Sequence, residues 1–479
     1  MTGSVMESVL DVAGMVDAAL WGPWTLGLIA FVSVYLTVRT RFFQLRRLGL
    51  IFSTTFGSLL RGEGRMEPRG KAARGRMTPF QATSTALAST VGMGSIAGIA
   101  AALSIGGPGA IFWMWLLALL GTITKTAEIT LAVHYRDVDE DGRFRGGPMY
   151  YIRKGLGWPV LATLFSLGIF VNALCSATLL QGHTVGRSFL ASYGTNPYLV
   201  TGAMTVVTAV VVIGGVRRIG RVSQSLVPLM SVVYILGGLT LFFVNWREIP
   251  FVFGTIVRHA FSPIPAVGGF AGAAVMQAIQ AGVARGMFSN EAGMGTAPMA
   301  HATAETEHPF QQGMWGAFEV WVVTFVICTI TAFAVLSTGV LASGASGIEL
   351  VILAFASVFP RGVAGNLISF CILTFCLSTM MGFFIYFETA SVDAFGKEAV
   401  RWLRWLYFIP PVVFAGIADV DRVWVFANIA VGVCAIPNLI AVLALSGPFL
   451  ELMRDYLSGR REYAAPLIDE SKDYVRKAN

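Results

Sequence analysis

Residues 89–98 read STVGMGSIAG, and they lie in the middle of an apolar segment long enough to cross a lipid bilayer. The stretch combines glycines with hydroxyl side chains: Gly92, Gly94, Gly98, Ser89, Thr90 and Ser95. Glycine inside a helix costs roughly 1 kcal/mol relative to alanine, so the sequence weakens this helix at its centre. Unwound backbone within a bilayer is tolerated only where it faces a cavity or buried protein. The stretch therefore predicts a broken helix beside a binding site.

A second glycine-interrupted stretch occurs about two hundred residues later. AGMGT at 292–296 is similar to VGMGS at 91–95, and it follows another glycine-rich stretch, QAGVARG at 280–286. Interrupted helices in corresponding positions of two halves are typical of transporters built from inverted repeats. Close helix packing through small residues is the alternative, because Gly94 and Gly98 have the spacing of a GxxxG contact. The second stretch favours a binding site over packing alone.

The composition indicates a helical membrane protein. Of 479 residues, 55% are hydrophobic and 13% are charged, whereas soluble domains average about 25% charged residues. The net charge of +7 does not indicate nucleic-acid binding, because the basic residues lie in loops between apolar segments. All five cysteines lie within apolar segments without CxxC spacing, so neither disulfides nor a thiolate metal site is expected.

Eleven apolar segments are long enough to be membrane crossings. They lie near residues 22–40, 80–104, 109–134, 159–190, 197–215, 223–245, 267–300 (interrupted), 313–339, 363–389, 403–418 and 423–447. A short amphipathic helix is expected at 4–20, and a half-length helix at 346–359 before Pro360.

The basic residues predict the orientation of the chain. Segment 39–78 carries ten lysines and arginines against two acidic residues, which places it in the cytoplasm. Alternation then puts the basic segments 214–221 and 396–404 on the same side. We therefore expect the N-terminus outside and the C-terminus in the cytoplasm.

Four motifs carry a resemblance to a known family. They are FQATSTALASTVGMGSIAG (80–98), GGPGAIFWMW (106–115), RGGPMYYIRKGLG (145–157) and GVARGMFSNEAGMGTAP (282–298). Together they closely resemble the alanine or glycine:cation symporters, also called the sodium:alanine symporters, and the resemblance runs from about residue 20 to 450.

The resemblance implies an all-α, LeuT-like fold of two inverted five-helix repeats with one additional N-terminal helix. The expected division is 1–78 (amphipathic segment, first crossing and basic loop), 79–245 (first repeat), 246–450 (second repeat) and 451–479 (cytoplasmic tail). It also implies import of small neutral amino acids, alanine or glycine, coupled to Na⁺, by a monomeric transport unit in the bacterial plasma membrane. No organic cofactor and no nucleic acid is implied.

The resemblance also implies a set of substrate-binding residues. From the first broken helix these are Ser89, Thr90, Gly92, Met93, Gly94 and Ser95; from the second they are Phe288, Ser289, Asn290 and Glu291. LLQGHTVG (179–186) adds Gln181, and LSTMMGFFIYFE (377–388) adds Thr379 and Phe383.

A sodium site is implied between the first broken helix and the ninth crossing. Its expected ligands are the carbonyls of Ala88 and Val91 and the hydroxyls of Ser378 and Thr379. Neutral oxygens suffice to replace part of the hydration shell of Na⁺.

The chain departs from the family pattern at two places. It has Met93 and Ser95 in GMGS where many members have GTGN, and Phe383 where many have tryptophan. A larger substrate such as glutamine, or coupling to H⁺, therefore stays open. Outside this class, an ion channel, an intramembrane enzyme and an amino-acid sensor are the alternatives; the sequence shows no convincing nucleophile–base pair for an enzyme and no added signalling domain for a sensor.

Several charged residues lie within predicted crossings, where such residues are functional candidates by default. Lys125 and Glu128 are three residues apart on one helix and are expected to form an ion pair. Arg285 and Glu291 flank the FSN motif, where they would close a cytoplasmic gate or anchor the unwound segment. Glu319 receives no assignment from the sequence.

Overall fold

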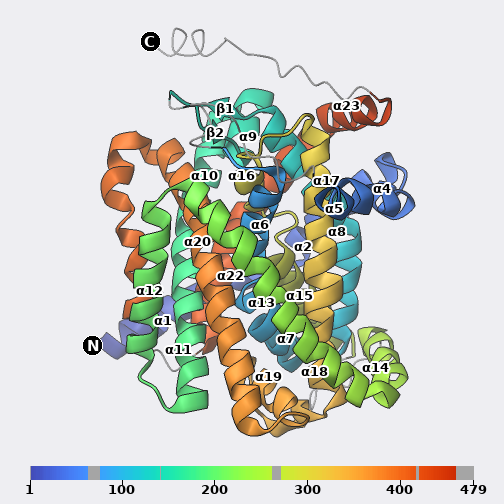
Figure 1. Cartoon of the computed structure of the whole chain (residues 1–479), viewed down its shortest axis with the longest axis vertical. Helices are drawn as coiled ribbons and strands as arrows, with labels where there is room; N and C mark the ends of the chain where they lie inside the picture. Colours follow the sequence, from blue (N-terminus) through green and yellow to red (C-terminus); the bar gives the residue numbers. More distant parts are fainter. Residues whose placement is uncertain (1, 63–75, 141, 262–270, 417–419, 460–479) are drawn as a thin grey trace.

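The fold is a bundle of long helices, described from a computed structural model for residues 2–62, 76–140, 142–261, 271–416 and 420–459 (Figure 1). The segments predicted to face the cytoplasm gather at one end, where α4, α5, α9 and α23 lie with the hairpin β1–β2 (Figure 1). Helices α14 and α19 are found at the other end. This grouping agrees with the predicted alternation of the loops.

The elements before the second interrupted stretch are mostly helices. They are α1 (Thr2–Leu20), α2 (Pro23–Arg39), α3 (Phe43–Arg46), α4 (Leu48–Thr54), α5 (Phe56–Leu60), α6 (Pro79–Thr90), α7 (Met93–Gly106), α8 (Gly109–His134), β1 (Asp137–Val138), β2 (Phe144–Arg145), α9 (Pro148–Leu156), α10 (Pro159–Leu174), the π-helix η3 (Cys175–Leu179), α11 (Leu180–Tyr193), α12 (Pro197–Ile213), α13 (Val216–Val244), η4 (Trp246–Glu248) and α14 (Ile249–Phe261). The two strands are antiparallel.

The remaining elements are helical. They are α15 (Ala271–Asn290), α16 (Ala297–His301), α17 (Pro309–Val320), the π-helix η5 (Trp321–Cys328), α18 (Thr329–Ser337), η6 (Val340–Ser343), α19 (Gly347–Ala356), α20 (Arg361–Leu403), η7 (Leu406–Phe408), α21 (Pro410–Val413), α22 (Val420–Ala444) and α23 (Ser446–Leu457). The predicted half-length helix is therefore confirmed as α19.

Eight helical stretches of the described residues are long and apolar enough to cross a membrane. They are Asp11–Arg39, Pro79–Gly106, Gly109–His134, Pro159–Tyr193, Val216–Val244, Pro309–Ser337, Arg361–Leu403 and Trp424–Ala444. The crossing predicted at 197–215 corresponds to α12, which is a shorter apolar helix. Part of the crossing predicted at 267–300, and most of the 451–479 tail, lie outside the described residues.

The predicted tenth crossing, at 403–418, was wrong as a continuous helix. The structure instead has two short pieces, η7 and α21, in this segment. Pro410 and Pro411 explain the difference, because proline lacks the N–H group that continues a helix and clashes with the preceding turn.

The first predicted break is confirmed between α6 and α7. A capping box starts α6: the Gln81 N–H donates to the Thr78 hydroxyl at 3.0 Å, and the Thr78 N–H donates to the Gln81 side chain at 3.1 Å. The helix stops at Thr90, and Val91 and Gly92 have non-helical dihedral angles. The chain then enters α7 at Met93.

The second break is confirmed between α15 and α16, at AGMGT rather than at QAGVARG. Glu291, Gly293 and Gly295 all have positive φ, at 56°, 92° and 75°. The glycines adopt this conformation without steric cost, which explains why the unwound segment is glycine-rich. Inverted two-fold symmetry between the halves stays a prediction.

Helix α8 lies next to both broken helices. It packs against α15 and α17 along much of its length and also contacts α7. Small residues permit this approach, since a side chain on Gly282 would collide with the Ala110 carbonyl of α8. The polar residues of α8 are thereby held beside the second break.

Candidate functional site

A small internal cavity lies where the two broken helices meet η3, α11 and α20. It is lined by Ser89, Thr90, Gly92, Gly94, Ser176, Gln181, Phe288, Glu291, Met294, Thr379 and Phe383. Nearly all of these residues are buried, and the space left among them holds about one water molecule. The cavity is therefore closed, and a ligand would enter only if lining groups moved.

Most residues predicted to bind substrate line this cavity. The ones that do are Ser89, Thr90, Gly92, Gly94, Gln181, Phe288, Glu291, Thr379 and Phe383. The remaining four, Met93, Ser95, Ser289 and Asn290, do not line it.

Ser95, Ser289 and Asn290 instead form contacts between helices. The Ser95 and Ser289 hydroxyls lie 2.8 Å apart and join α7 to α15. The Asn290 amide donates to the Thr324 hydroxyl at 3.1 Å, and its side-chain oxygen accepts from the Ala292 N–H at 2.9 Å. These polar side chains hold the broken helices in place.

The N-terminus of α7 faces the cavity. The Met93 N–H lies 3.5 Å from the Gln181 side-chain oxygen, at the limit of a hydrogen bond. Gln181 is held from its other side, because its amide donates to the Ser176 carbonyl at 3.0 Å. Unpaired N–H groups at a helix N-terminus attract a carboxylate. This end of the cavity is suited to a negative group.

The predicted sodium ligands converge only in part. The Ser378 and Thr379 hydroxyls lie 3.3 Å and 3.0 Å from the Ala88 carbonyl oxygen, so α20 meets α6 one turn before the break. Both hydroxyls also lie within hydrogen-bond distance of the Phe375 carbonyl. No described hydrogen bond joins the Val91 carbonyl to this group. The arrangement gathers neutral oxygens of the kind that bind Na⁺.

Ser176 lines the cavity, although no pattern in the sequence singles it out. It lies in the π-helix η3, its hydroxyl is buried, and that hydroxyl has no hydrogen-bond partner within the described part of the chain. Short π-helical turns are frequent at functional sites because they shift side chains around the helix axis. No residue type in CSATL reveals such a turn, so this signal is absent from the sequence.

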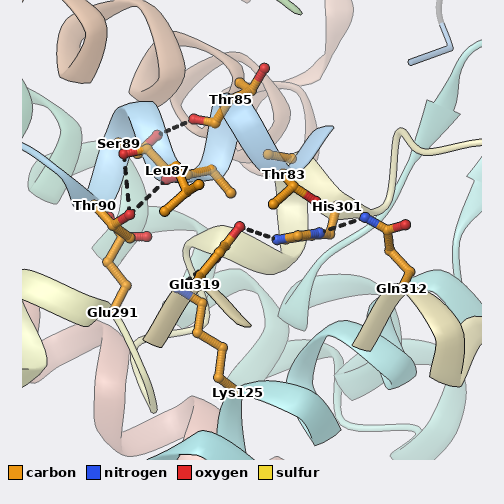
Figure 2. A network of polar contacts seen from close by, with 12 residues as sticks. Thr83, Thr85, Leu87, Ser89, Thr90, Lys125, Glu291, His301, Gln312 and Glu319 are labelled. Atoms are coloured by element: carbon orange, nitrogen blue, oxygen red, sulfur yellow. Dashed lines mark hydrogen bonds and ion pairs between the residues drawn. The ribbon is translucent and has the colours of Figure 1, made fainter. Parts of the chain in front are cut away.

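Glu291 is the only acidic residue lining the cavity, as far as the structure is described. The Thr296 hydroxyl donates to its carboxylate at 2.7 Å, across the unwound segment. Figure 2 shows Glu291 directed toward Thr90 of the first broken helix. The predicted anchoring of the unwound segment is thus seen for Glu291. Its carboxyl group makes the cavity lining around it suited to a positive group.

The predicted ion pair between Lys125 and Glu128 was wrong. Lys125 instead pairs with Glu319 at 3.0 Å, and both side chains are fully buried (Figure 2). Glu128 accepts a hydrogen bond from Asn438, whose amide also donates to the Gly293 carbonyl at 2.9 Å. Tertiary partners on α17 and α22 thus replace the local pair, because α8 is packed against other helices on several sides.

Arg285 contacts α22. Its guanidinium donates to the Asn428 side chain at 3.2 Å and lies 3.6 Å from the ring centre of Trp424, both on α22. Phe288 packs against the same tryptophan, with ring centres 5.1 Å apart. Since α15 runs away from the end predicted to be outside, Arg285 lies on the outer side of Glu291. A role of Arg285 at a cytoplasmic gate stays a prediction.

Comparisons with known proteins agree with this organisation. The profile of the sodium:alanine symporter family matches residues 6–470. The chain is 34% identical to the sodium/alanine symporter AgcS of Methanococcus maripaludis, over 91% of this chain and 95% of the relative. It is 35% identical to the probable sodium/glutamine symporter GlnT of Bacillus subtilis, over 99% of this chain and 96% of that protein.

The fold has relatives among solved structures. A manganese transporter of Eremococcus coleocola, crystallised with an aromatic bis-isothiourea compound, aligns with a TM-score of 0.52 over 81% of both chains at 12% identity. This likeness concerns the helical architecture alone. The family match covers nearly the whole sequence: the chain is a multi-pass membrane transporter and belongs to the sodium:alanine symporter family.

Proposed function

We propose that the chain imports a small neutral amino acid, alanine or glycine, by coupling its transport to Na⁺ through alternating access. The observation that carries this proposal is the meeting of the Ser378 and Thr379 hydroxyls at the Ala88 carbonyl. The three oxygens lie directly beside the closed cavity, which Thr379 also lines. A cation bound there would touch the first broken helix and α20 together.

The cavity lining includes a helix N-terminus and a carboxyl group, which support a zwitterionic substrate. The α-carboxylate would lie at the N-terminus of α7, near Gly92 and Gly94, where the helix dipole is positive. The ammonium group would lie toward the Glu291 carboxylate. The side-chain amide of Gln181 also lies at the carboxylate position, with its oxygen near the Met93 N–H and its nitrogen bonded to the Ser176 carbonyl.

Two aromatic rings in the cavity wall support alanine or glycine over glutamine. Phe288 and Phe383 both line the cavity, and they limit the room beside a bound amino acid once the lining groups move apart. Glutamine, the substrate named for GlnT, adds an extended amide side chain that the aromatic rings would have to admit. A glutamine-preferring transporter is the second candidate, because the unpartnered Ser176 hydroxyl offers a polar contact for a longer side chain.

Thr379 belongs to both proposed sites, and this would couple cation binding to substrate binding. Its hydroxyl is a cation ligand in the proposed site, and the residue lines the substrate cavity. A cation that orders the α6–α7 break would improve substrate binding, and the substrate would improve cation binding by the same factor. In the predicted orientation the site would open first to the outside and then to the cytoplasm. An H⁺-coupled cycle would not need the neutral-oxygen site.

The test is uptake of radiolabelled L-alanine into proteoliposomes with an inward Na⁺ gradient, with choline replacing Na⁺ in the control. Unlabelled glycine, D-alanine and glutamine serve as competitors. Na⁺-dependent accumulation that glycine blocks is the expected result. Accumulation driven by a proton gradient without Na⁺ would overturn Na⁺ coupling. Flux that does not saturate with substrate would indicate a channel.

A further inference from the structure

Lys125 places a buried positive charge at the break in the second broken helix. Its ammonium group donates to the Asn290 carbonyl oxygen at 2.7 Å. The same group lies 3.0 Å from the carboxylate of Glu319, which Figure 2 shows beside Lys125. Asn290 is the last residue of α15, so this carbonyl lies at the C-terminal end of a half-helix. Such carbonyls lack a partner within the helix and carry the negative end of its dipole.

The groups around this ammonium would otherwise suit a monovalent cation. Half-helix C-termini and unwound carbonyls coordinate Na⁺ in transporters with broken helices, and a carboxylate adds a full negative charge. Here one carbonyl and one carboxylate already contact Lys125. The buried charge is thereby compensated within the protein.

The carboxylate of Glu319 is fixed by a chain of buried side chains. The Nε2 atom of His301 lies 2.8 Å from a carboxylate oxygen of Glu319 (Figure 2). The Nδ1 atom of the same ring lies 2.7 Å from the side-chain nitrogen of Gln312. If the Gln312 amide donates to Nδ1, a neutral His301 donates from Nε2 to Glu319. Glu319 then keeps its negative charge for Lys125.

The two helix breaks therefore differ in what they offer a cation. At the first break the Ala88 carbonyl meets two neutral hydroxyls, whereas at the second break the Asn290 carbonyl meets an ammonium group. The oxygens at the first break can bind a free ion, whereas the carbonyl at the second break already binds the ammonium group of Lys125. This difference in charge between the two breaks comes from the side chains of the protein, and it does not depend on which substrate is bound.

We propose that the Lys125 ammonium is a tethered cation, which occupies the second helix break in place of a second coupling ion. Transport would then draw on one free cation, bound at Ala88, Ser378 and Thr379. This inference rests on the proposed function, since it assumes coupling to Na⁺ at the first break. Lys125 is a positioning residue here, because it acts through the Asn290 backbone and does not line the substrate cavity.

The test is the Na⁺ dependence of alanine uptake by the full-length wild type and by two variants. For the wild type we expect a Hill coefficient for Na⁺ of about 1 and equal fluxes of radiolabelled Na⁺ and alanine. In Lys125→Met the Asn290 carbonyl and the Glu319 carboxylate lose their cation. A second Na⁺ is then needed, so we expect the Hill coefficient to rise toward about 2.

The matched control is Lys125→Met/Glu319→Gln, which removes both members of this ion pair. This variant is expected to reach the membrane even where the single variant does not, because an unpaired buried charge is the larger cost. Its Hill coefficient should stay at about 1, and its uptake should be at least about tenfold slower than that of the wild type. Uptake by this double variant at the wild-type rate would overturn the proposal.

Two further outcomes separate this inference from the proposed function. A wild-type protein that shows no Na⁺-dependent uptake contradicts the proposed function itself. A wild-type protein that transports alanine with a Hill coefficient of about 2 contradicts only the role of Lys125.

Discussion

The hydroxyl of Thr379 lies 3.0 Å from the carbonyl oxygen of Ala88, and it lies 2.5 Å from the point where a Cβ atom on Gly92 would stand. The middle of α20 thus touches the first broken helix on both sides of its interruption. A glycine is required at position 92 for this approach, since any larger residue would displace the hydroxyl. The proposed cation site depends on this contact.

Removing the hydroxyls tests the cation site. Ser378→Ala and Thr379→Val each take away one oxygen ligand, so we expect the half-saturating Na⁺ concentration to rise about tenfold, the equivalent of about 1.4 kcal/mol. Na⁺ titrations of alanine uptake measure this. Ser369→Ala on the same helix is the control, because that hydroxyl bonds Ser188 at 3.1 Å and lies outside the cavity. An unchanged Na⁺ dependence in Ser378→Ala and Thr379→Val would contradict the site.

A pair of glycines in α7 gives a second, steric test. A Cβ on Gly94 would stand 2.7 Å from the Phe288 ring, whereas a Cβ on Gly98 would meet Trp424 at an ordinary 3.6 Å. We expect Gly94→Ala to reduce uptake by at least about tenfold, because displacing Phe288 costs more than about 1 kcal/mol. Gly98→Ala should transport normally. Membrane abundance of both variants is compared by immunoblot, and equal uptake by the two would contradict the placement of Gly94.

The unpartnered hydroxyl of Ser176 predicts an effect on binding without a loss of stability. Ser176→Ala removes a buried polar group that has no hydrogen bond in the described structure, so thermal unfolding of the purified protein should be unchanged. The apparent KM for alanine should rise about three- to tenfold if the hydroxyl contacts the substrate. Thr178→Val is the control, since Thr178 lies in the same π-helix and bonds the Leu174 carbonyl. A lower melting temperature with an unchanged KM would assign Ser176 a structural role instead.

We expect Phe383 to limit the size of the substrate that the cavity accepts. Phe383→Ala removes an aromatic ring from the cavity wall, so we expect glutamine to compete with alanine better relative to glycine by about tenfold. Competition uptake assays give the ratio directly. Phe384→Ala is the matched control, because Phe384 packs against Tyr407, with ring centres 5.3 Å apart, and does not line the cavity. The same change in both variants would indicate a general loosening of α20.

The sequence predicted the local features of the fold well because glycine and proline act on their own backbone. GMGS and GMGT marked both helix breaks, and the chain does break at Gly92 and between Glu291 and Gly295. The prediction of one helix at 403–418 was wrong because it followed the hydropathy of the segment and gave too little weight to its two prolines. Hydrophobic length alone does not say whether an apolar segment is one helix.

The interaction partners of side chains were harder to predict from the sequence than the positions of the helix breaks. The spacing of Lys125 and Glu128 suggested a local pair, but their partners lie on α17 and α22, which sequence spacing does not encode. Likewise, the motif around Ser89–Ser95 did not show that Ser95 turns to Ser289 and away from the cavity. The predicted lining residues that agree with the structure came from the family resemblance, which carries information on tertiary arrangement.

Glu291 has a backbone conformation that its own side chain disfavours. A residue with a Cβ pays about 1 kcal/mol or more to hold a φ of 56°, whereas glycine would hold it without that strain. Gly293 and Gly295 in the same segment show that the chain meets this demand with glycine elsewhere. A glycine at position 291 would thus relieve strain and at the same time remove the carboxylate that faces Thr90. The fold therefore keeps a less stable loop that holds an acidic side chain beside the first broken helix.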